Sequence, residues 1–505
     1  MAGPLRRLAR VSPPVIHRRL LVREAALAAV SRLAPKATST LLAILLVRRY
    51  GPNIAGAYTL SVSYSTVLVL LSSFGLDELV LREVAIDPEK TRKYLLNAAV
   101  VRALLALVSY AALVGLVLPR MGYGAAIRQV IRLQGLSVLP LSLSAVVSAV
   151  FAANQRMVYV AAATGLTAVL QLTGGLVAIR NGAPLVDIVR ISVVAATAGS
   201  LAQLGLAGWW SARQGAPRGD PTVTLAYGLS LVRRSLPFFL VIGLASLDAD
   251  LNVLVLSRRS SIEAVGWYGA ARVPLQVLLL LPQSLRQAIY PAMSRGSATS
   301  EADLRRIYRT GWLASALLAF PIAVGGQFFS GPILRLVYPD VTSIAIITLN
   351  VLLGHLLANF LYQSGTRLLV ATEQQAALAA FLGGSIILNL LCSLFLVPRH
   401  GAVGAAAARA LSSVVYFLMV EIHVWRRALP RAAPIGSLPS VVGAVTVMVC
   451  VLLASQKLQW PIRAVLGSLT YIVVVAVLAD PIGLGGRSLR LQLPGGRPQG
   501  GRGSR

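Results

Sequence analysis

The sequence predicts an all-α integral membrane protein with about fourteen transmembrane helices, and three observations lead to this fold class. The chain of 505 residues is 56% hydrophobic and only 13% charged, whereas a soluble protein of ordinary composition carries about 25% charged residues. Its mean hydropathy is +0.74. Apolar runs of bilayer length recur along the chain, and no hydrophilic stretch between them is long enough for a soluble domain.

Ten of the predicted spans contain no Lys, Arg, Asp or Glu. They lie at 50–76, 103–119, 133–155, 157–179, 191–212, 310–334, 341–366, 374–398, 432–456 and 464–479. Four further apolar runs are interrupted by charged residues, at 25–47, 235–257, 266–290 and 402–422. A charge inside a span costs free energy on insertion, so these four spans are expected to face a wet cavity or a partner group.

The distribution of basic residues predicts the orientation of the spans. With the N-terminus in the cytoplasm, the segments on that side carry 28 Lys and Arg residues and the opposite loops carry 13. The remaining six lie within spans or at their edges. This excess is what the positive-inside rule requires, so both termini are predicted to be cytoplasmic.

Several classes of function do not fit the composition. The formal net charge of +30 could indicate nucleic-acid binding, but the basic residues lie between apolar runs and aromatic residues make up only 6%. Cys392 and Cys450 lie inside apolar runs and form neither a disulfide framework nor a metal-binding pattern. No DxD motif, His–Glu pair or phosphate-binding glycine loop occurs. We therefore expect no nucleic-acid partner, no catalytic residues, no bound metal and no cofactor.

The segment 47–58 recurs at 257–268 with a constant offset of 210 residues, so that Gly56 and Gly266 occupy equivalent positions. One repeat holds six spans, an even number, and the two halves therefore enter the membrane from the same side. Parallel repeats of this kind are typical of transporters with a site between two lobes.

The repeat gives the predicted domain organisation. A cytoplasmic tail (1–24) precedes an N-lobe of six spans (25–212), a connector (213–234) and a C-lobe of six spans (235–425). Two C-terminal spans (432–483) and a disordered basic tail (484–505) follow.

Five segments carry a resemblance to a known family. They are RYGPNIAGAY (49–58), SFGLD (73–77), EAVGWYGAARV (263–273), LPQSLRQAIYP (281–291) and PRHGAVGAAA (398–407) with Asn389 before it. In order and spacing, the chain resembles the oligosaccharide flippase family over about residues 20–425. This family is the polysaccharide-export branch of the multidrug and oligosaccharidyl-lipid exporter superfamily.

The resemblance implies two six-helix lobes around a V-shaped cavity lined mainly by spans 1, 2, 7 and 8. It implies a bacterial or archaeal cytoplasmic membrane protein that moves an undecaprenyl-pyrophosphate-linked oligosaccharide from the inner to the outer leaflet by alternating access. Membrane lipids and this polyprenyl-pyrophosphate-linked glycan are then the expected partners, with polysaccharide assembly proteins left open. Three alternatives remain: a multidrug or cation exporter, a peptidoglycan-precursor flippase, and a membrane glycan polymerase or ligase.

Three basic residues are candidates for holding the pyrophosphate in the cavity. Arg32 and Lys36 lie four residues apart in span 1 and therefore share a helix face. Arg272 lies one turn into span 8. The alternatives are snorkelling of Arg32 and Lys36 to the membrane surface, and an interlobe ion pair for Arg272.

Acidic and amide residues in spans 7 and 11 are candidates for coupling transport to Na⁺ or H⁺. Asp248 and Asn252 share a helix face, and with Asn389 they offer oxygen ligands that suit a hard cation. Asp250 points to nearly the opposite side, and either aspartate could instead neutralise an arginine. Members of the family often carry an acidic residue where this chain has Asn252, so coupling at the usual position is in doubt.

Two further sets of residues complete the candidates. The arginine pairs at the outer ends of spans 1 and 7 are interfacial anchors or gating residues of the outer mouth: Arg48, Arg49, Arg258 and Arg259. His355 interrupts span 10 and is either a proton carrier or a hydrogen-bonded structural imidazole.

Overall fold

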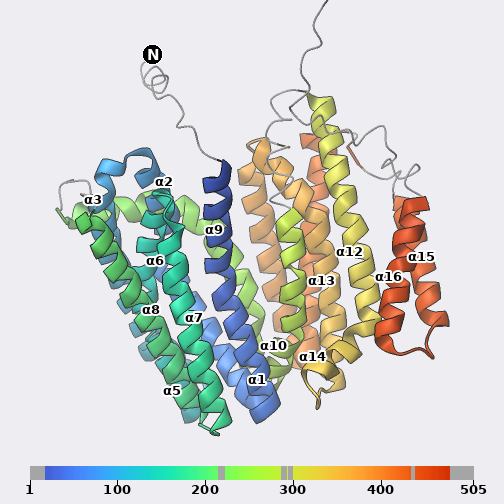
Figure 1. The fold of residues 1–505 in the computed structure, drawn as a ribbon, viewed down its shortest axis with the longest axis horizontal. Helices are drawn as coiled ribbons and strands as arrows, with labels where there is room; N and C mark the ends of the chain where they lie inside the picture. Colours follow the sequence, from blue (N-terminus) through green and yellow to red (C-terminus); the bar gives the residue numbers. More distant parts are fainter. Residues whose placement is uncertain are drawn as a thin grey trace, which may run out of the picture. The chain divides into compact units, whose positions relative to one another are not determined.

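The computed structural model describes residues 18–213, 222–285, 300–430 and 438–477, together with Met293, Ala432 and Ala433. Its regular elements in these ranges are all helical (Figure 1). The first half holds α1 (Arg18–Ser73), α2 (Leu76–Ile86), α3 (Thr91–Ala112), α4 (Leu118–Met121), α5 (Ala125–Gly135), α6 (Val138–Ala153), α7 (Met157–Arg180) and α8 (Leu185–Arg213). The second half holds α9 (Leu225–Arg259), α10 (Ile262–Leu278), α12 (Glu301–Val337), α13 (Ser343–Ala371), α14 (Gln375–His423), α15 (Leu438–Ala454) and α16 (Trp460–Val477).

Ten helices in the described ranges are long and apolar enough to cross a membrane. Two of them, Ala26–Ser73 and Gln375–Ala428, each cover two predicted spans. The helices α9 and α15 cover two more, so each of the fourteen predicted spans lies on a helix. The predicted fold class is confirmed, and the chain is a multi-pass membrane protein.

The repeat seen in the sequence recurs as a break in the helices. Within α1 the backbone leaves the helical region at Gly51, whose φ of 80° is a left-handed conformation that glycine adopts without strain. In the second copy, α9 ends at Arg259 and α10 begins at Ile262. Of the two residues between them, Ser260 has φ −140° and ψ −133°. Both copies therefore turn from one span into the next at nearly equivalent positions.

The described chain divides into two compact units. The first comprises Met1–Val273, Tyr338–Ala345 and Ile386–Ala408. Within it, α7 packs between α1 and α8, and α5 also contacts α1 and α8 (Figure 1). A core shared by α2, α3 and α6 is built from Leu76, Leu79, Tyr94, Ala98 and Val150.

The second unit comprises Pro274–Val337, Ile346–Ser385 and Arg409–Arg505. A core of this unit joins α12, α13 and the end of α14 through Tyr308, Trp312, Leu368 and Val420. The last two helices, α15 and α16, pack together and against α12. The Tyr471 hydroxyl donates to the Leu317 carbonyl at 2.9 Å, which ties α16 to α12.

Candidate functional site

The polar residues of spans 7 and 11 form one hydrogen-bonded network in the first unit. Asn389 Nδ2 donates to Asp248 Oδ1 at 3.0 Å. Ser393 Oγ donates to Asn252 Oδ1 at 2.7 Å and lies 3.4 Å from Asn389 Oδ1. Asn252, Asn389 and Ser393 are all buried. The network brings the predicted trio of Asp248, Asn252 and Asn389 together and adds the hydroxyl of Ser393.

Asp250 faces a different set of partners. Its Oδ1 accepts a hydrogen bond from Ser63 Oγ at 3.0 Å and lies 3.6 Å from Arg272 Nη1. Residues two apart on a helix point to nearly opposite sides, which is why Asp248 and Asp250 reach different neighbours. The two aspartates are therefore not equivalent in structure.

The ion pair between Arg272 and Asp250 joins α10 to α9, and thus spans 8 and 7 within the predicted C-lobe. The guanidinium carbon also lies 5.8 Å from the centre of the Tyr268 ring. Both charged side chains keep some exposure, 20% for Arg272 and 14% for Asp250. At 3.6 Å the contact is looser than a charge-assisted hydrogen bond, so the guanidinium retains capacity for another acceptor.

The other predicted cations of the cavity are less defined. The side chain of Arg32 lies outside the described residues. Lys36 is exposed on α1. Among the ion pairs that the described residues make, none involves Lys36. Their role in binding a substrate stays a prediction.

A close crossing of the two repeats lies at the predicted outer ends of spans 2 and 8. A Cβ on Gly56 would lie 2.0 Å from the carbonyl oxygen of Ile262, and a Cβ on Gly266 would lie 2.0 Å from that of Pro52. Both the glycines and the carbonyls are related by the repeat offset of 210 residues. The crossing is therefore a symmetric pair of contacts between glycine and backbone, one from each repeat.

Side chains extend the contacts around this crossing. Four arginines near the crossing are exposed: Arg48 and Arg49 just before the kink of α1 at Gly51, and Arg258 and Arg259 in the last turn of α9. Tyr123, which follows α4, shares a hydrogen bond of 2.7 Å with Ser257 near the end of α9 and one of 3.2 Å with Tyr64 of α1. Sequence reasoning missed Tyr123, because nothing in its local pattern predicts a partner 134 residues away.

Charged clusters hold α2, α3 and α9 together at the predicted cytoplasmic end of the first unit. The completely buried Arg102 donates to Asp77, a residue of the SFGLD segment. Glu83 accepts hydrogen bonds from the Tyr94 hydroxyl at 2.9 Å and from Arg234 at 2.5 Å. Burial by itself would raise the pKa of the Glu83 carboxyl, but these two hydrogen bonds and the nearby guanidinium charges leave that pKa below its ordinary value.

In the second unit, His355 is buried and its Nδ1 lies 2.6 Å from Ser413 Oγ. This is the environment expected of a structural imidazole with a hydrogen-bond partner.

Two family models match the chain. The model described as polysaccharide biosynthesis protein matches residues 21–297, and the model described as MatE matches residues 250–395.

Two curated proteins of the archaeon Haloferax volcanii are similar in sequence. The probable flippase AglR is 28% identical over 248 residues, which is 46% of this chain and 50% of that protein. The probable low-salt glycan biosynthesis flippase Agl15 is 30% identical over 152 residues, which is 30% of this chain and 32% of that protein. The chain thus spans half or less of the length of these relatives.

Solved structures share the fold. The lipid II flippase MurJ in an inward closed conformation superposes with a TM-score of 0.75 over 91% of this chain and 99% of that chain, at 14% identity. A multidrug resistance transporter of the MATE family in an inward-facing conformation superposes with a TM-score of 0.62 over 79% and 98%, at 14% identity. At this identity the likeness shows the fold alone.

Proposed function

Because the chain belongs to the polysaccharide biosynthesis protein family, we propose that it is a flippase that moves a lipid-linked oligosaccharide across the cytoplasmic membrane for polysaccharide biosynthesis. In this proposal the carrier is undecaprenyl pyrophosphate and the movement runs from the inner to the outer leaflet. The protein works by alternating access and breaks no bond. The names of the two Haloferax volcanii relatives support the class of activity.

The observation that supports alternating access most directly is the symmetric crossing at Gly56 and Gly266. A transporter of this kind must close one end of its pathway while the other is open. The crossing brings equivalent segments of the two repeats into backbone contact at one end. Separating the two helices there would open that end.

The proposed pyrophosphate ligands are Arg32, Lys36 and Arg272. A pyrophosphate entering a low-dielectric space loses hydration, and fixed cations must offset that loss. Arg272 is held by Asp250 at 3.6 Å, so an arriving phosphate would compete with this carboxylate for the guanidinium. Release of the substrate would then restore the ion pair between α9 and α10.

The network of Asp248, Asn252, Asn389 and Ser393 is the proposed site of ion coupling. It offers a carboxylate, two amide oxygens and a hydroxyl, which are hard oxygen ligands suited to Na⁺, and the carboxylate alone suits H⁺. Occupation of the site would replace the hydrogen bond between Asn389 and Asp248, and so change how span 11 is held against span 7.

A flipping assay in liposomes tests the proposal. Purified protein is reconstituted with a fluorescent undecaprenyl-pyrophosphate-linked oligosaccharide, and the fraction exposed in the outer leaflet is measured with an impermeant quencher. We expect wild-type protein to raise that fraction, and the Arg32→Ala, Lys36→Ala double variant to lose the activity. The matched control is Arg180→Ala with Lys457→Ala, which removes two exposed charges elsewhere. Normal flipping by the first double variant would contradict the cationic site.

The match of residues 250–395 to the MatE model supports one second candidate, an exporter of lipophilic cations. Such cations are held by carboxylates and aromatic faces. If the protein has this function, its expression should raise the resistance of cells to cationic dyes, and Asp248→Asn should abolish that resistance. If the protein is a flippase of anionic lipids, dye resistance should stay unchanged.

A further inference from the structure

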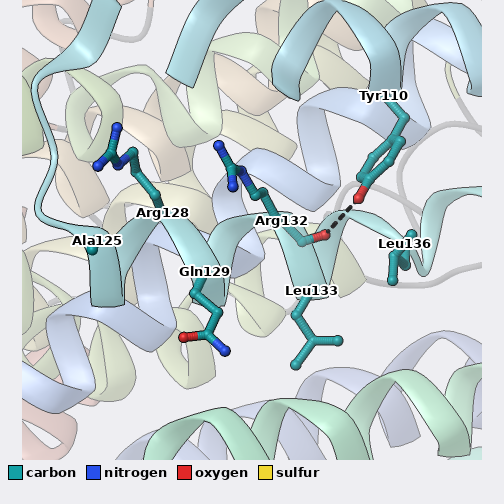
Figure 2. Close-up of a pocket in the computed structure, with 7 residues that line it drawn as sticks. All are labelled: Tyr110, Ala125, Arg128, Gln129, Arg132, Leu133 and Leu136. Carbon is teal, nitrogen blue, oxygen red and sulfur yellow. Dashed lines mark hydrogen bonds between the residues drawn. The ribbon is translucent and has the colours of Figure 1, made fainter. Parts of the chain in front are cut away.

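A groove of about 380 Å³ lies along α5 and beside Tyr110 of α3, in the first unit (Figure 2). Its wall is formed by Tyr110, Ala125, Arg128, Gln129, Arg132, Leu133 and Leu136. The Tyr110 hydroxyl donates to the backbone carbonyl of Arg132 at 3.2 Å and so fixes α5 against α3. The groove is separate from the crossing and from the polar network of spans 7 and 11.

The groove carries positive charge that no acidic residue offsets. Arg128 and Arg132 are one helical turn apart, and Figure 2 shows both guanidinium groups projecting from the same side of α5. The chain contains no Asp or Glu between Glu89 and Asp187. In the part of the chain that the structure describes, neither guanidinium takes part in an ion pair.

The groove is lined by both polar and apolar side chains. Arg128 and Arg132 lie one turn apart on α5, Leu133 directly follows Arg132, and Leu136 lies just after the end of the helix. Leu136 is 47% exposed. The neighbouring helix α3 exposes Leu107 and Val108, as expected of a surface in contact with lipid chains.

The opposite face of α5 is anchored. Val130 and Ile131 are buried, and the helix packs against α1 and α8. The arginines are therefore presented by a helix whose position is set by protein contacts.

We propose that this groove binds an anionic phospholipid of the surrounding bilayer. The guanidinium groups of Arg128 and Arg132 hold the phosphate by charge-assisted, bidentate hydrogen bonds. An acyl chain lies along Leu133 and Leu136. Free phosphate could satisfy the arginines but would leave the exposed Leu136 uncovered, so the lining of the groove favours a lipid.

The experiment measures lipid binding by native mass spectrometry on the full chain purified in detergent. Short-chain phosphatidylglycerol is titrated against phosphatidylcholine with the same acyl chains. We expect wild-type protein to prefer the anionic lipid, and Arg128→Gln with Arg132→Gln to bind it about thirtyfold more weakly. Each basic residue at an anionic membrane surface contributes about 1 kcal/mol, and about 1.4 kcal/mol corresponds to tenfold. The control Arg120→Gln with Arg180→Gln removes two exposed arginines outside the groove and should retain the preference.

Two further arms separate the charge from the lipid chain. Arg128→Lys with Arg132→Lys keeps the charge and the fold but loses the bidentate geometry, so its preference should fall between the wild type and the glutamine variant. Leu136→Gln should weaken binding of the anionic lipid and leave any effect of inorganic phosphate on the protein unchanged. Three results would each overturn the proposal. The glutamine variant could keep the full preference, or the control could lose it to the same extent. Inorganic phosphate could also protect the protein against thermal unfolding as well as the lipid does.

Discussion

Substitution of Gly56 by alanine tests the crossing of the repeats directly. The new Cβ would lie 2.0 Å from the carbonyl oxygen of Ile262, and Cβ atoms essentially never approach another heavy atom within 3.0 Å. The obstructing atom belongs to the backbone and cannot rotate away, so α1 and α10 must move apart by about 1 Å or more to relieve the overlap. The structure in which the two helices cross is therefore destabilised.

The size of the effect follows from two opposing contributions. Overpacking costs about 1–3 kcal/mol, and more where backbone must shift. Replacing a helical glycine by alanine returns about 0.5–1 kcal/mol. A net penalty of about 2 kcal/mol would shift the ratio of crossed to separated conformations by roughly thirtyfold. Gly266→Ala should have an equal effect, because its Cβ would lie 2.0 Å from the Pro52 carbonyl oxygen.

The assay measures the accessibility of a buried residue beside the crossing. Val265→Cys is introduced after Cys392 and Cys450 are replaced by alanine, and its rate of labelling by an impermeant thiol reagent is measured. Val265 is fully buried, so labelling should be slow in the parent protein and markedly faster with Gly56→Ala. The control is Gly165→Ala, whose Cβ would have no atom within 4 Å. Equal labelling rates in the two alanine variants would refute the reasoning.

The remaining predictions concern four carboxylates. Asp248→Asn should weaken the dependence of transport on a cation, whereas Asp250→Asn should mainly lower the amount of folded protein; identical losses in flipping assays and yield would argue against an ion site. Glu83→Gln should lower the free energy of unfolding at neutral pH by at most about 1 kcal/mol, and the melting temperature should fall with it. The contribution of Glu83 is complete above the ordinary pKa of a glutamate and disappears as the pH falls through its lowered folded pKa, so the two melting curves should converge in acid. Glu421 is fully buried and accepts a hydrogen bond from Tyr308, while its Oε1 has no partner among the described residues. Glu421→Gln should therefore leave thermal stability unchanged or raise it, and a clear loss would show that a charge is needed there.

The fold class, the spans and the family could be predicted from the sequence, because each depends on local composition or on the order of motifs along the chain. Apolar runs separated by polar residues predict membrane helices, because in a lipid bilayer a helix satisfies its own backbone hydrogen bonds. The family resemblance is confirmed by the family model over residues 21–297. The repeat offset predicted the equivalence of Gly56 and Gly266, but the distance between them and the opposite carbonyls depends on how two helices cross.

Side-chain partners were harder to predict. Asp248, Asn252 and Asn389 were grouped from helix periodicity and a family motif, and they do lie in one hydrogen-bonded network; their role in ion coupling stays a prediction. Ser393 was missed, since a hydroxyl is common in an apolar span and carries no signal by itself. Arg102 lies just before the predicted span 103–119 and drew no assignment, whereas it is completely buried and bonded to Asp77, 25 residues earlier in the sequence.

The region around α5 shows a different reason for a missed element. Residues 120–132 lie between two predicted spans and contain three arginines, yet most of this segment is helical and continues into α6 after a short turn. Its buried and charged residues alternate with the period of a helix, a pattern visible only when the segment is separated from the apolar run after it.

In the proposed alternating-access cycle, the crossing at Gly56 and Gly266 would also influence how fast its end of the pathway opens. Each of its two contacts joins a residue without a side chain to a peptide carbonyl. These two contacts can part without a change of rotamer, because neither of them involves a side chain. In the proposed cycle, the opening rate should then depend in part on the rigid movement of whole helices through the lipid, and a more viscous bilayer should slow it.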